Sequence, residues 1–377
     1  MQLLIQLGID VNAKDKRGKN ALHLLCKWNS SPNLIDASQL LIKLGIDVNA
    51  KDNSTMNALH YLCWYNSSPN LIDAIQLLIQ LGIDVNAKDK RGKNALHLLC
   101  QLKSSPNLID ALQRLIQLGI DVNAKDNSGR NALHYLCEPN SSPNLIDAIK
   151  LLIQLGIDVN AKNEWGKNAL HLLCQLKSSP NLIDASQLLI KLGIDVNAKD
   201  NSGRNALHYL CGFNSSSNLI DAIQLLIQLG IDVNAKDSIW ERNPLHYLCE
   251  SNSSPNLIDA IQLLIKQGID VNAKERFEMT ALHYLCKWNS SANLIDAIQL
   301  LIQLGIDVNA KDNLGLNALH YLCKSNSSPN LIDAIQLLIQ LGNLVLSNGH
   351  DARDYLRYHN KFSNKDEILK LLDEAVF

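Results

Sequence analysis

The chain has 377 residues, of which 46% are hydrophobic and 19% charged, so it has enough apolar residues to build a folded core. Lysine and arginine together number 35, aspartate and glutamate number 37, and the net charge is -2. This balance gives no general attraction for a phosphate backbone or an anionic lipid surface. Nucleic acid and membrane are therefore not the expected partners.

The N-terminal segment does not read as a secretory signal, because it lacks a basic region and reaches Asp10 before a long apolar stretch forms. Elsewhere polar residues interrupt every apolar stretch well short of the roughly 18 residues that a membrane helix needs. We therefore expect a cytoplasmic protein, with the nucleus as the alternative location.

An internal repeat organises the chain. A Leu-His pair recurs nine times, and successive copies are 37 residues apart except for a spacing of 38 between His208 and His246. The histidines are His23, His60, His97, His134, His171, His208, His246, His283 and His320. One repeat of this length cannot bury its own apolar face, so the repeats are expected to stack on one another.

Each repeat is predicted to begin with a turn and a short helix, as residues 126–138 illustrate. Gly129 supplies the positive φ that a tight turn often requires. Asn131 is expected to be the N-cap of a first helix that runs from Ala132 to about Glu138, because its side-chain oxygen can accept from an unpaired helix amide.

A second helix is predicted to follow in the same repeat. Ser142 and Pro143 provide a cap and a first helical residue, and Leu155-Gly156 ends the helix with glycine at the C′ position. Apolar residues recur between these points at helical spacing and form a face that neighbouring repeats must cover.

Two segments of this repeat carry a family resemblance. Asn131-Ala-Leu-His134 resembles the Thr-Pro-Leu-His start of an ankyrin repeat, and Gly156-Ile-Asp-Val-Asn-Ala-Lys162 is similar to the Gly-Ala-Asp-Val-Asn-Ala-Lys that closes one. Asn243-Pro-Leu-His246 and Thr280-Ala-Leu-His283 each restore one letter of the motif. The unit exceeds the usual length of about 33 residues in its Asn-Ser-Ser-Pro-Asn connector, and Leu-Cys replaces the common Ala-Ala.

The resemblance implies an all-α solenoid of stacked helix-turn-helix units joined by hairpin loops. We expect residues 1–377 to form one such solenoid, with a partial repeat at 1–14, nine repeats over 15–342 and a capping repeat at 343–377. The sequence begins inside a second helix, Gln2 to Leu7, and so suggests a fragment of a longer array or an incomplete gene model. A frayed start that tolerates exposure is the alternative.

Nine cysteines invite a metal or redox interpretation, since each stands three residues after a repeat histidine, as Cys26 follows His23. The next pair lies one repeat away, about 10 Å if the helices pack normally. That spacing is too long for zinc ligands or for a disulfide. We expect buried free thiols, no metal and no cofactor.

In the ankyrin family the histidine of this motif is structural and bonds backbone near the turn and toward the next repeat. We carry that role over to all nine histidines. A catalytic base would be unique, whereas this residue is copied nine times, so the sequence favours a protein that is not an enzyme.

Asparagines recur in an Asp-Val-Asn tripeptide near each hairpin. They are Asn12, Asn49, Asn86, Asn123, Asn160, Asn197, Asn234, Asn272 and Asn309. Leu4 to Asn12 is similar to the ankyrin sequence on which asparaginyl hydroxylation occurs, which makes hydroxylation of some of them a hypothesis. The favoured alternative is hydrogen bonding within the turn.

The copies differ chiefly at the hairpin tips and at the end of the first helix. In ankyrin folds these zones line the concave surface that binds partners, and Tyr and Trp are common interface hot spots. We therefore predict a protein-binding surface, and packing of these rings under the connector of their own repeat is the alternative. The predicted residues are Trp28, Tyr61, Tyr65, Trp165, Tyr209, Phe213, Trp240, Phe277, Tyr284 and Trp288.

The favoured function is a monomeric interaction module or scaffold that binds a protein partner. A second candidate is the sensing or regulatory array of a larger multidomain enzyme. A third is a binder of an acidic ligand such as an oligonucleotide, through Lys16, Arg17, Lys19, Lys90, Arg91, Lys93, Arg130 and Arg204. Acidic tip residues at Glu164, Glu241 and Glu278 weaken this third candidate.

Overall fold

The computed structural model describes residues 8–28, 33–65, 70–101, 107–138, 144–177, 180–213, 216–251, 256–325, 328–341, 352–358 and 365–374. Within these ranges all regular secondary structure is helical, and the helices from α2 to α19 form nine pairs in chain order. Each pair has a short first helix and a longer second helix. The predicted all-α class is confirmed.

The first helices are α2 (Ala21–Lys27), α4 (Ala58–Trp64), α6 (Ala95–Gln101), α8 (Ala132–Cys137), α10 (Ala169–Cys174), α12 (Ala206–Phe213), α14 (Pro244–Ser251), α16 (Ala281–Trp288) and α18 (Ala318–Ser325). The second helices are α3 (Leu34–Lys43), α5 (Leu71–Gln80), α7 (Leu108–Gln117), α9 (Leu145–Gln154), α11 (Leu182–Lys191), α13 (Leu219–Gln228), α15 (Leu257–Lys266), α17 (Leu294–Gln303) and α19 (Leu331–Leu341). Two more helices follow, α20 (Ala352–Tyr358) and α21 (Lys365–Glu374).

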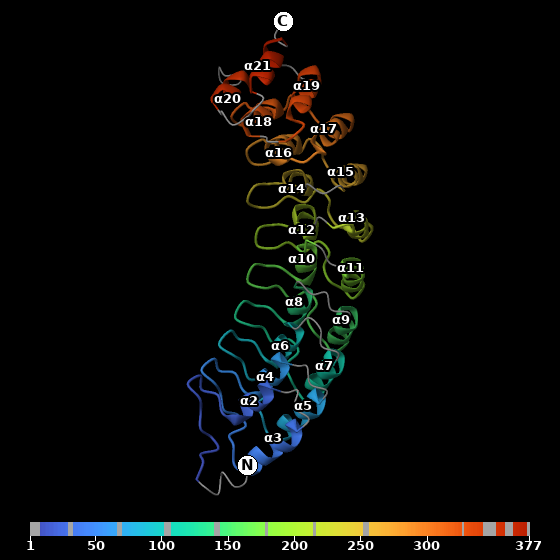
Figure 1. Cartoon of the computed structure of the whole chain (residues 1–377). Coiled ribbons are helices and arrows are strands. Elements are labelled where there is room, and N and C mark those ends of the chain that lie inside the picture. The colour runs from blue at the N-terminus through green and yellow to red at the C-terminus, as the bar shows by residue number, and fades with distance from the viewer. Residues whose placement is uncertain are drawn as a thin grey trace. The chain divides into compact units, whose positions relative to one another are not determined.

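The chain divides into two compact units: unit 1 is Met1–Leu173 with Asp184–Ile194, and unit 2 is Cys174–Ile183 with Asp195–Phe377. In unit 1, α2, α4, α6 and α8 pack side by side in one layer, and α3, α5, α7 and α9 pack in a second. The hairpins project from the first-helix layer (Figure 1). Unit 2 repeats this arrangement with α12 to α20 and α13 to α21.

The first helices begin at an asparagine or threonine cap, as the sequence predicts. The Asn131 side-chain oxygen accepts from the His134 amide at 3.3 Å, and the Asn131 amide donates to His134 Nδ1 at 3.2 Å. The other ring nitrogen, Nε2, donates to the Lys167 carbonyl at 3.1 Å. Since a carbonyl can only accept, the proton lies on Nε2. The structural role predicted for the histidines is confirmed at His134.

The second helices begin slightly later than the sequence predicts. The helix α9 starts at Leu145 with Asn144 at the N-cap position, while Ser142 and Pro143 lie outside the described residues. Its predicted end is confirmed, because Gly156 has a φ of 89° directly after the last turn. In unit 2 the equivalent N-cap Asn256 donates to the Ser216 carbonyl of the preceding connector at 3.0 Å.

The loop asparagines join neighbouring repeats. Asn49 Nδ2 donates to the Gly82 carbonyl at 2.8 Å, and Asn49 Oδ1 accepts from the Asp84 amide at 2.6 Å. The bond within the turn is made instead by the Asn49 backbone amide, which donates to the Asp47 carboxylate at 2.9 Å. The expectation of bonding within the turn therefore holds for the backbone, whereas the side chain bonds to the next repeat.

The nine cysteines are all buried and free, as predicted. Burial raises the pKa of the eight thiols from Cys26 to Cys286, that of Cys26 to about 12, so these remain protonated and pack as small apolar groups. In the described ranges no three His, Cys, Asp or Glu side chains come together in a way that could hold a metal ion.

The last two helices close unit 2 with a charged outer surface. Leu356 of α20 and Ile368 and Leu372 of α21 are fully buried, while Asp366 and Glu367 are exposed. Arg353 pairs with Asp373 at 3.1 Å. Among the described helices, none combines the length and the apolar character needed to cross a bilayer.

Candidate functional site

Each hairpin is held by an acidic or amide side chain at its first position. In the fourth repeat Asp126 Oδ1 accepts from the Ser128 amide at 2.9 Å and from the Arg130 amide at 2.8 Å. Gly129 has a φ of 74°, which confirms the predicted turn glycine. Bonds between neighbouring tips complete the pairing of the tip backbone, since the Asn127 amide donates to the Arg91 carbonyl and the Glu164 amide to the Ser128 carbonyl, each at 2.9 Å.

Three hairpins place a larger residue where the others have glycine. Thr55, Glu241 and Glu278 have φ values of 60°, 61° and 63°. A left-handed conformation at such residues costs roughly 1–2 kcal/mol relative to glycine. The surrounding hairpin bonds hold this strain, and the tip gains a side chain that glycine cannot offer.

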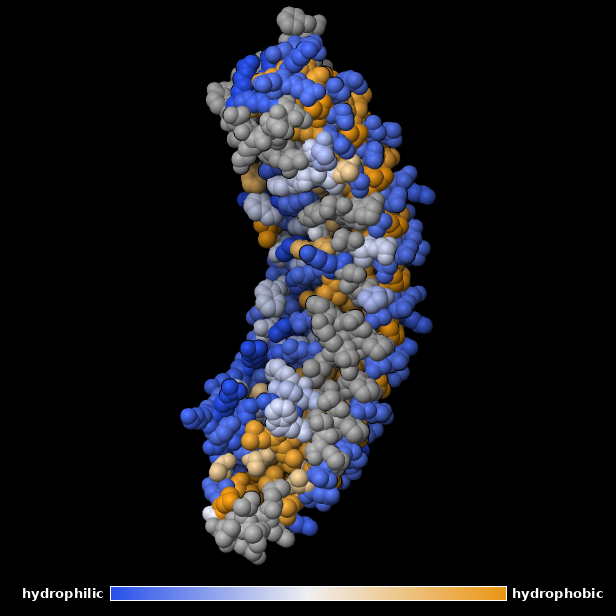
Figure 2. Space-filling view, in the orientation of Figure 1, coloured by the Kyte–Doolittle hydropathy of each residue, from blue (hydrophilic) through white to orange (hydrophobic). Residues whose placement is uncertain are grey.

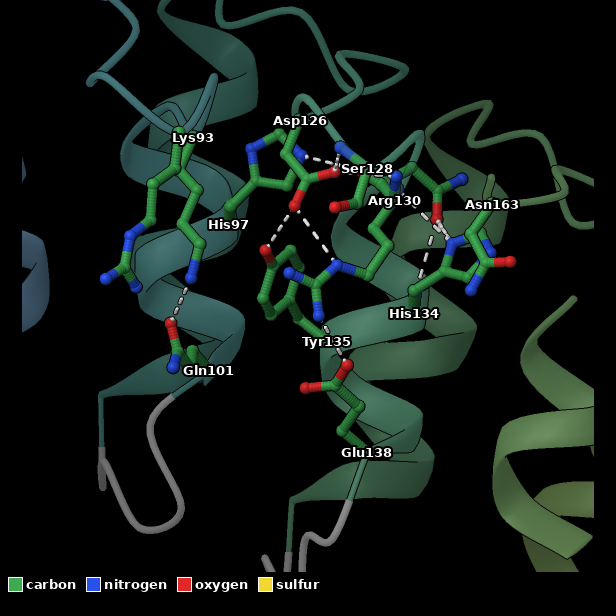
Figure 3. A network of polar contacts seen from close by, with 12 residues as sticks. Lys93, His97, Gln101, Asp126, Ser128, Arg130, His134, Tyr135, Glu138 and Asn163 are labelled. Carbon is green, nitrogen blue, oxygen red and sulfur yellow. Dashed lines mark hydrogen bonds and ion pairs between the residues drawn. The ribbon is translucent and has the colours of Figure 1, made fainter. Parts of the chain in front are cut away.

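A buried polar network supports the hairpin from below (Figure 3). Tyr135, on the first helix, donates its hydroxyl to Asp126 Oδ2 at 2.5 Å, and its ring meets His97 edge-on at 5.5 Å. Arg130 Nε lies 3.1 Å from the same carboxylate, and its Nη1 lies 2.8 Å from Glu138. The hairpin and the first helix are thus fixed to each other.

The network also sets the charge states. Burial acts to raise the pKa of Asp126, but the hydrogen bond from Tyr135 and the backbone amides outweigh it and lower that pKa. Burial likewise raises the pKa of Tyr135, and it lowers the pKa of His97 and of His134 to about 4. The carboxylate is therefore ionised at neutral pH and the histidines are neutral.

The predicted site residues fall into two classes in the structure. Tyr61, Tyr209 and Tyr284 are buried, with exposed fractions of 5%, 1% and 1%. Tyr61 and Tyr209 donate to the hairpin carboxylates of Asp52 and Asp200, at 2.6 and 2.5 Å. These rings support the surface and do not form it.

The other predicted residues are exposed. Their exposed fractions are 68% for Trp28, 41% for Tyr65, 52% for Trp165, 42% for Phe213, 38% for Trp240, 42% for Phe277 and 40% for Trp288. Three of them contact the ring of a buried tyrosine four residues earlier. The ring centres are 6.4 Å apart in the stacked pair Tyr61–Tyr65, 5.9 Å in the stacked pair Tyr209–Phe213 and 4.8 Å in the tilted pair Tyr284–Trp288. The predicted common helix face is confirmed for these pairs.

Two adjacent hairpins of unit 2 form an aromatic pair that the sequence does not reveal. Trp240 and Phe277 have ring centres 5.6 Å apart, and Arg242 lies over the Trp240 ring at 5.7 Å. Ile239 and Leu314, on the same row of tips, are exposed by 44% and 57%. Trp64, exposed by 37%, is a further aromatic residue missing from the predicted set. Its position next to Tyr65 could have indicated it.

The structure leaves only four of the eight predicted basic residues exposed. Lys19 and Lys93 are buried, and Lys93 Nζ donates to Gln101 at 2.9 Å. Arg130 and Arg204 are paired with the carboxylates of Asp126 and Asp200. The members of the predicted set that are exposed are Lys16, Arg17, Lys90 and Arg91, and their hairpins lie on the strongly hydrophilic edge at the lower left of Figure 2.

Comparison with known proteins identifies the family. A family model described as ankyrin repeats in three copies matches residues 1–89, 67–163, 140–237, 214–312 and 245–348. These matches span well over half of the chain. The chain belongs to the ankyrin repeat family. The resemblance predicted from the repeat motifs is confirmed.

Among solved structures, this ankyrin repeat chain is similar to the crystal structure of the ankyrin repeat domain of Bcl-3, described as a unique member of the IkappaB protein family. The identity is 25% and the TM-score 0.48, and the similarity covers 61% of this chain and 94% of the other. A search of curated proteins finds no match. Ankyrin repeat domains are generally protein-protein interaction modules, and the fold is typically non-catalytic.

Proposed function

We propose that this ankyrin repeat protein is an interaction scaffold that binds a partner protein through its hairpin tips and the ends of its first helices. The observation that carries the proposal is the pairing of exposed aromatic rings with buried ones. Trp288 is 40% exposed, yet its ring packs in a tilted contact against Tyr284, which is 1% exposed. Such a ring is held in place before a partner arrives.

This arrangement favours binding for an energetic reason. Ordering a free side chain at an interface costs about 0.5–1.5 kcal/mol, and a ring already fixed by stacking avoids part of that cost. Lys287 Nζ lies 4.0 Å from the Trp288 ring centre and adds a cation-π contact that restrains it further. Fixed aromatic rings with one open face are the usual hot spots of interfaces.

The first experiment removes three exposed rings, in the variant Trp165→Ala/Trp240→Ala/Trp288→Ala. Affinity capture with the intact chain, analysed by mass spectrometry, identifies the partner, and the triple variant should lose it. The melting temperature should change little, because all three rings are 38–52% exposed.

A matched control is Leu81→Ala, which removes another exposed apolar side chain, 37% accessible, from the end of a second helix. It should retain the partner. A large loss of stability in the triple variant would instead show that the rings serve packing, and retention of the partner would contradict the proposal.

The proposal also includes a cytoplasmic, monomeric protein. Nine buried free thiols suit a reducing compartment, where cysteines are kept as thiols. Cell fractionation and light scattering of the purified chain would test the location and the monomeric state. Recovery from a secretory fraction or a stable dimer would contradict them.

A second candidate function, binding of an acidic ligand such as an oligonucleotide, has one observation in its favour. Lys16, Arg17, Lys90 and Arg91 are exposed on two hairpins of unit 1, and no described carboxylate forms an ion pair with them. Binding of a fluorescent oligonucleotide should then fall with added salt, with a log–log slope of at most about -3 for four contacts to a single strand. Absence of binding at low salt would exclude it.

A further inference from the structure

The first helices of unit 2 carry a variable residue directly after their buried cysteine. In chain order this residue is Gly212, Glu250, Lys287 and Lys324. The helices α16, α18 and α20 pack side by side, so Lys287 and Lys324 lie on neighbouring helices of one layer. Both lysine side chains are half-buried. The charge at this position therefore changes from acidic to basic within unit 2.

An acidic residue at this position has an internal partner. Glu250 accepts from Arg242 at 2.9 Å, and Glu138, at the same position in unit 1, accepts from Arg130 at 2.8 Å. Each arginine stands at the base of the hairpin of its own repeat. The hairpin cation and the helix carboxylate thus neutralise each other inside one repeat.

The eighth and ninth repeats lack such an internal pair. At the base of the hairpin they have Met279 and Leu316, which are buried with exposed fractions of 4% and 1%. The helix position carries Lys287 or Lys324 instead, and within the described ranges no carboxylate forms an ion pair with either lysine. These two repeats therefore present a cation that the described part of the chain does not neutralise.

Aromatic rings hold the two ammonium groups in place. Lys287 Nζ lies 4.0 Å from the ring centre of Trp288 and 5.1 Å from that of Tyr321 on the next helix. Lys324 Nζ lies 5.6 Å from the ring centre of Tyr355 on α20. Cation-π attraction favours these positions. Cations and rings alternate across three helices, and we call these five residues the lysine row.

The two lysines also repel each other. Burial lowers the pKa of Lys287, and the charge of Lys324 lowers it further. The carboxylates of Asp312 and Glu250 act in the opposite direction, but each is engaged elsewhere, Asp312 by the Tyr321 hydroxyl at 2.7 Å and Glu250 by Arg242. A carboxylate from outside would relieve this repulsion. The lysine row is thus complementary to negative charge.

We propose that the partner protein binds the lysine row with an acidic polypeptide segment. The inference rests on the proposed function and adds the chemistry of the partner. Neighbouring helices pack about 8–10 Å apart, and every third residue of an extended polyproline II segment recurs after about 9 Å on one side of the chain. Two acidic residues with this spacing would meet Lys287 and Lys324. An apolar residue between them would contact the open face of Trp288, which is 40% exposed.

The test uses a fluorescent nonapeptide of three Glu-Pro-Leu units, titrated with the full chain at low salt and followed by anisotropy. The variant Lys287→Gln/Lys324→Gln should bind it about tenfold more weakly or worse, because two ion pairs are lost. A peptide of three Gln-Pro-Leu units should show the same loss with the wild-type chain. Equal binding of the two peptides, or of the variant and the wild type, would overturn the proposal.

Two further variants separate charge from packing. Lys266→Gln/Lys311→Gln removes two exposed lysines elsewhere in unit 2 and should bind the acidic peptide as the wild type does. Lys287→Arg/Lys324→Arg keeps both charges and should also bind it. The melting temperature of Lys287→Gln/Lys324→Gln should stay within about 2 °C of the wild type. Loss of binding in either of the first two variants would contradict a role of these two charges.

A nine-residue oligothymidine tests the other acidic occupant. Tighter binding of this oligonucleotide than of the peptide, lost in Lys287→Gln/Lys324→Gln, would assign the lysine row to nucleic acid and overturn the proposal. Affinity capture with the same variant separates this inference from the proposed function. If Trp165→Ala/Trp240→Ala/Trp288→Ala loses the captured partner and the lysine variant retains it, the proposed function stands and this inference fails. If the tryptophan variant retains the partner, the proposed function itself fails.

Discussion

The hairpins of unit 1 and unit 2 share a backbone and differ in what they present. In unit 1, the tips at Lys16-Arg17 and Lys90-Arg91 are cationic, and each is followed by a glycine. In unit 2, the tips at Trp240-Glu241 and Phe277-Glu278 carry an aromatic ring followed by a glutamate with positive φ. The same hairpin backbone therefore presents cationic side chains at the first two tips and aromatic and acidic side chains at the other two.

The difference in the glycine position has a structural reason. A Cβ on Gly92 would lie 2.4 Å from the Asn127 side-chain oxygen and 2.7 Å from the Asn127 amide nitrogen of the next hairpin. Unit 2 tolerates a Cβ at Glu278 of its aromatic hairpins. Gly203 of unit 2 is equally confined, since a Cβ there would lie 2.2 Å from the Ser238 side-chain oxygen, whereas Thr55 of unit 1 carries a Cβ at the same position. The glycine is therefore required where the next tip lies against the turn, in either unit.

The largest expected effect concerns the framework that the two units share. His97 and His134 in unit 1 and His208 and His246 in unit 2 have pKa values lowered to about 4, chiefly by burial. Between pH 6.5 and 4 the unfolded chain binds more protons than the folded chain, so stability falls with falling pH. These two histidines alone should cost up to about 3 kcal/mol per pH unit in each unit, at about 1.4 kcal/mol each. His23 and His60 in unit 1 and His283 in unit 2, whose pKa values burial also lowers, add to this loss.

Urea unfolding followed by hydrogen exchange at pH 7, 6 and 5 would measure this loss in each unit separately. Both units should weaken together, and stability should be nearly constant between pH 7 and 8. A clear difference in slope between the units would show that the framework itself, and not only the tips, distinguishes them.

The next largest effect comes from exchanging the residue type at the positive-φ position. Gly92→Ala should destabilise unit 1 by about 2 kcal/mol or more, because it adds left-handed strain and a clash with Asn127. Glu278→Gly should stabilise unit 2 by up to about 1 kcal/mol, because the strain it relieves exceeds the entropy cost of glycine and the loss of the exposed ion pair with Lys274, 2.9 Å away. Thermal unfolding of both variants checks the opposite signs, and equal signs would refute the comparison.

A smaller effect is expected from the aromatic pair of unit 2. A double-mutant cycle of Trp240→Ala and Phe277→Ala should give a coupling energy of about 0.5–1.5 kcal/mol, as for other aromatic pairs with this separation. The pair Trp240→Ala and Trp288→Ala serves as a reference cycle. Coupling near zero in the first cycle would mean that the two rings are independent at the tip.

The smallest effect is expected from the cations of unit 1. Lys90→Ala/Arg91→Ala should change the free energy of unfolding by less than about 0.5 kcal/mol, because both side chains are exposed and unpaired with described carboxylates. Chemical denaturation measures this change. A larger loss would assign these residues to stability and would weaken the acidic-ligand candidate.

The sequence predicted the repeated parts of the structure well, because each has a local cause. The Asn131 cap, the glycine at position 156 and the buried thiols follow from propensity and spacing alone. The role of the histidines followed from the family resemblance. The carbonyl that accepts from His134 lies 33 residues away in the next repeat.

The depth of side chains could not be predicted in the same way. The sequence places Tyr61 and Tyr65 on one helix face. Their burial depends on the preceding repeat, where His23 covers Tyr61 and leaves Tyr65 exposed. The side chain of Asn49 reaches the next repeat for the same reason. The pairing of Trp240 with Phe277 depends on two hairpins of different length, which sequence spacing does not resolve.

The asparagine bonds between loops have a consequence for how the number of repeats can change. Asn12, Asn49 and Asn86 each join the same two backbone groups of the following repeat, as Asn12 bonds Gly45 and Asp47, and Asn49 bonds Gly82 and Asp84. Deleting residues 52–88 would therefore bring Asn49 opposite Gly119 and Asp121, the groups that Asn86 now bonds. The array can thus lose or gain whole 37-residue segments, as recombination between its near-identical copies would produce, and the loop asparagine at the new junction would still make its hydrogen bonds to the next repeat.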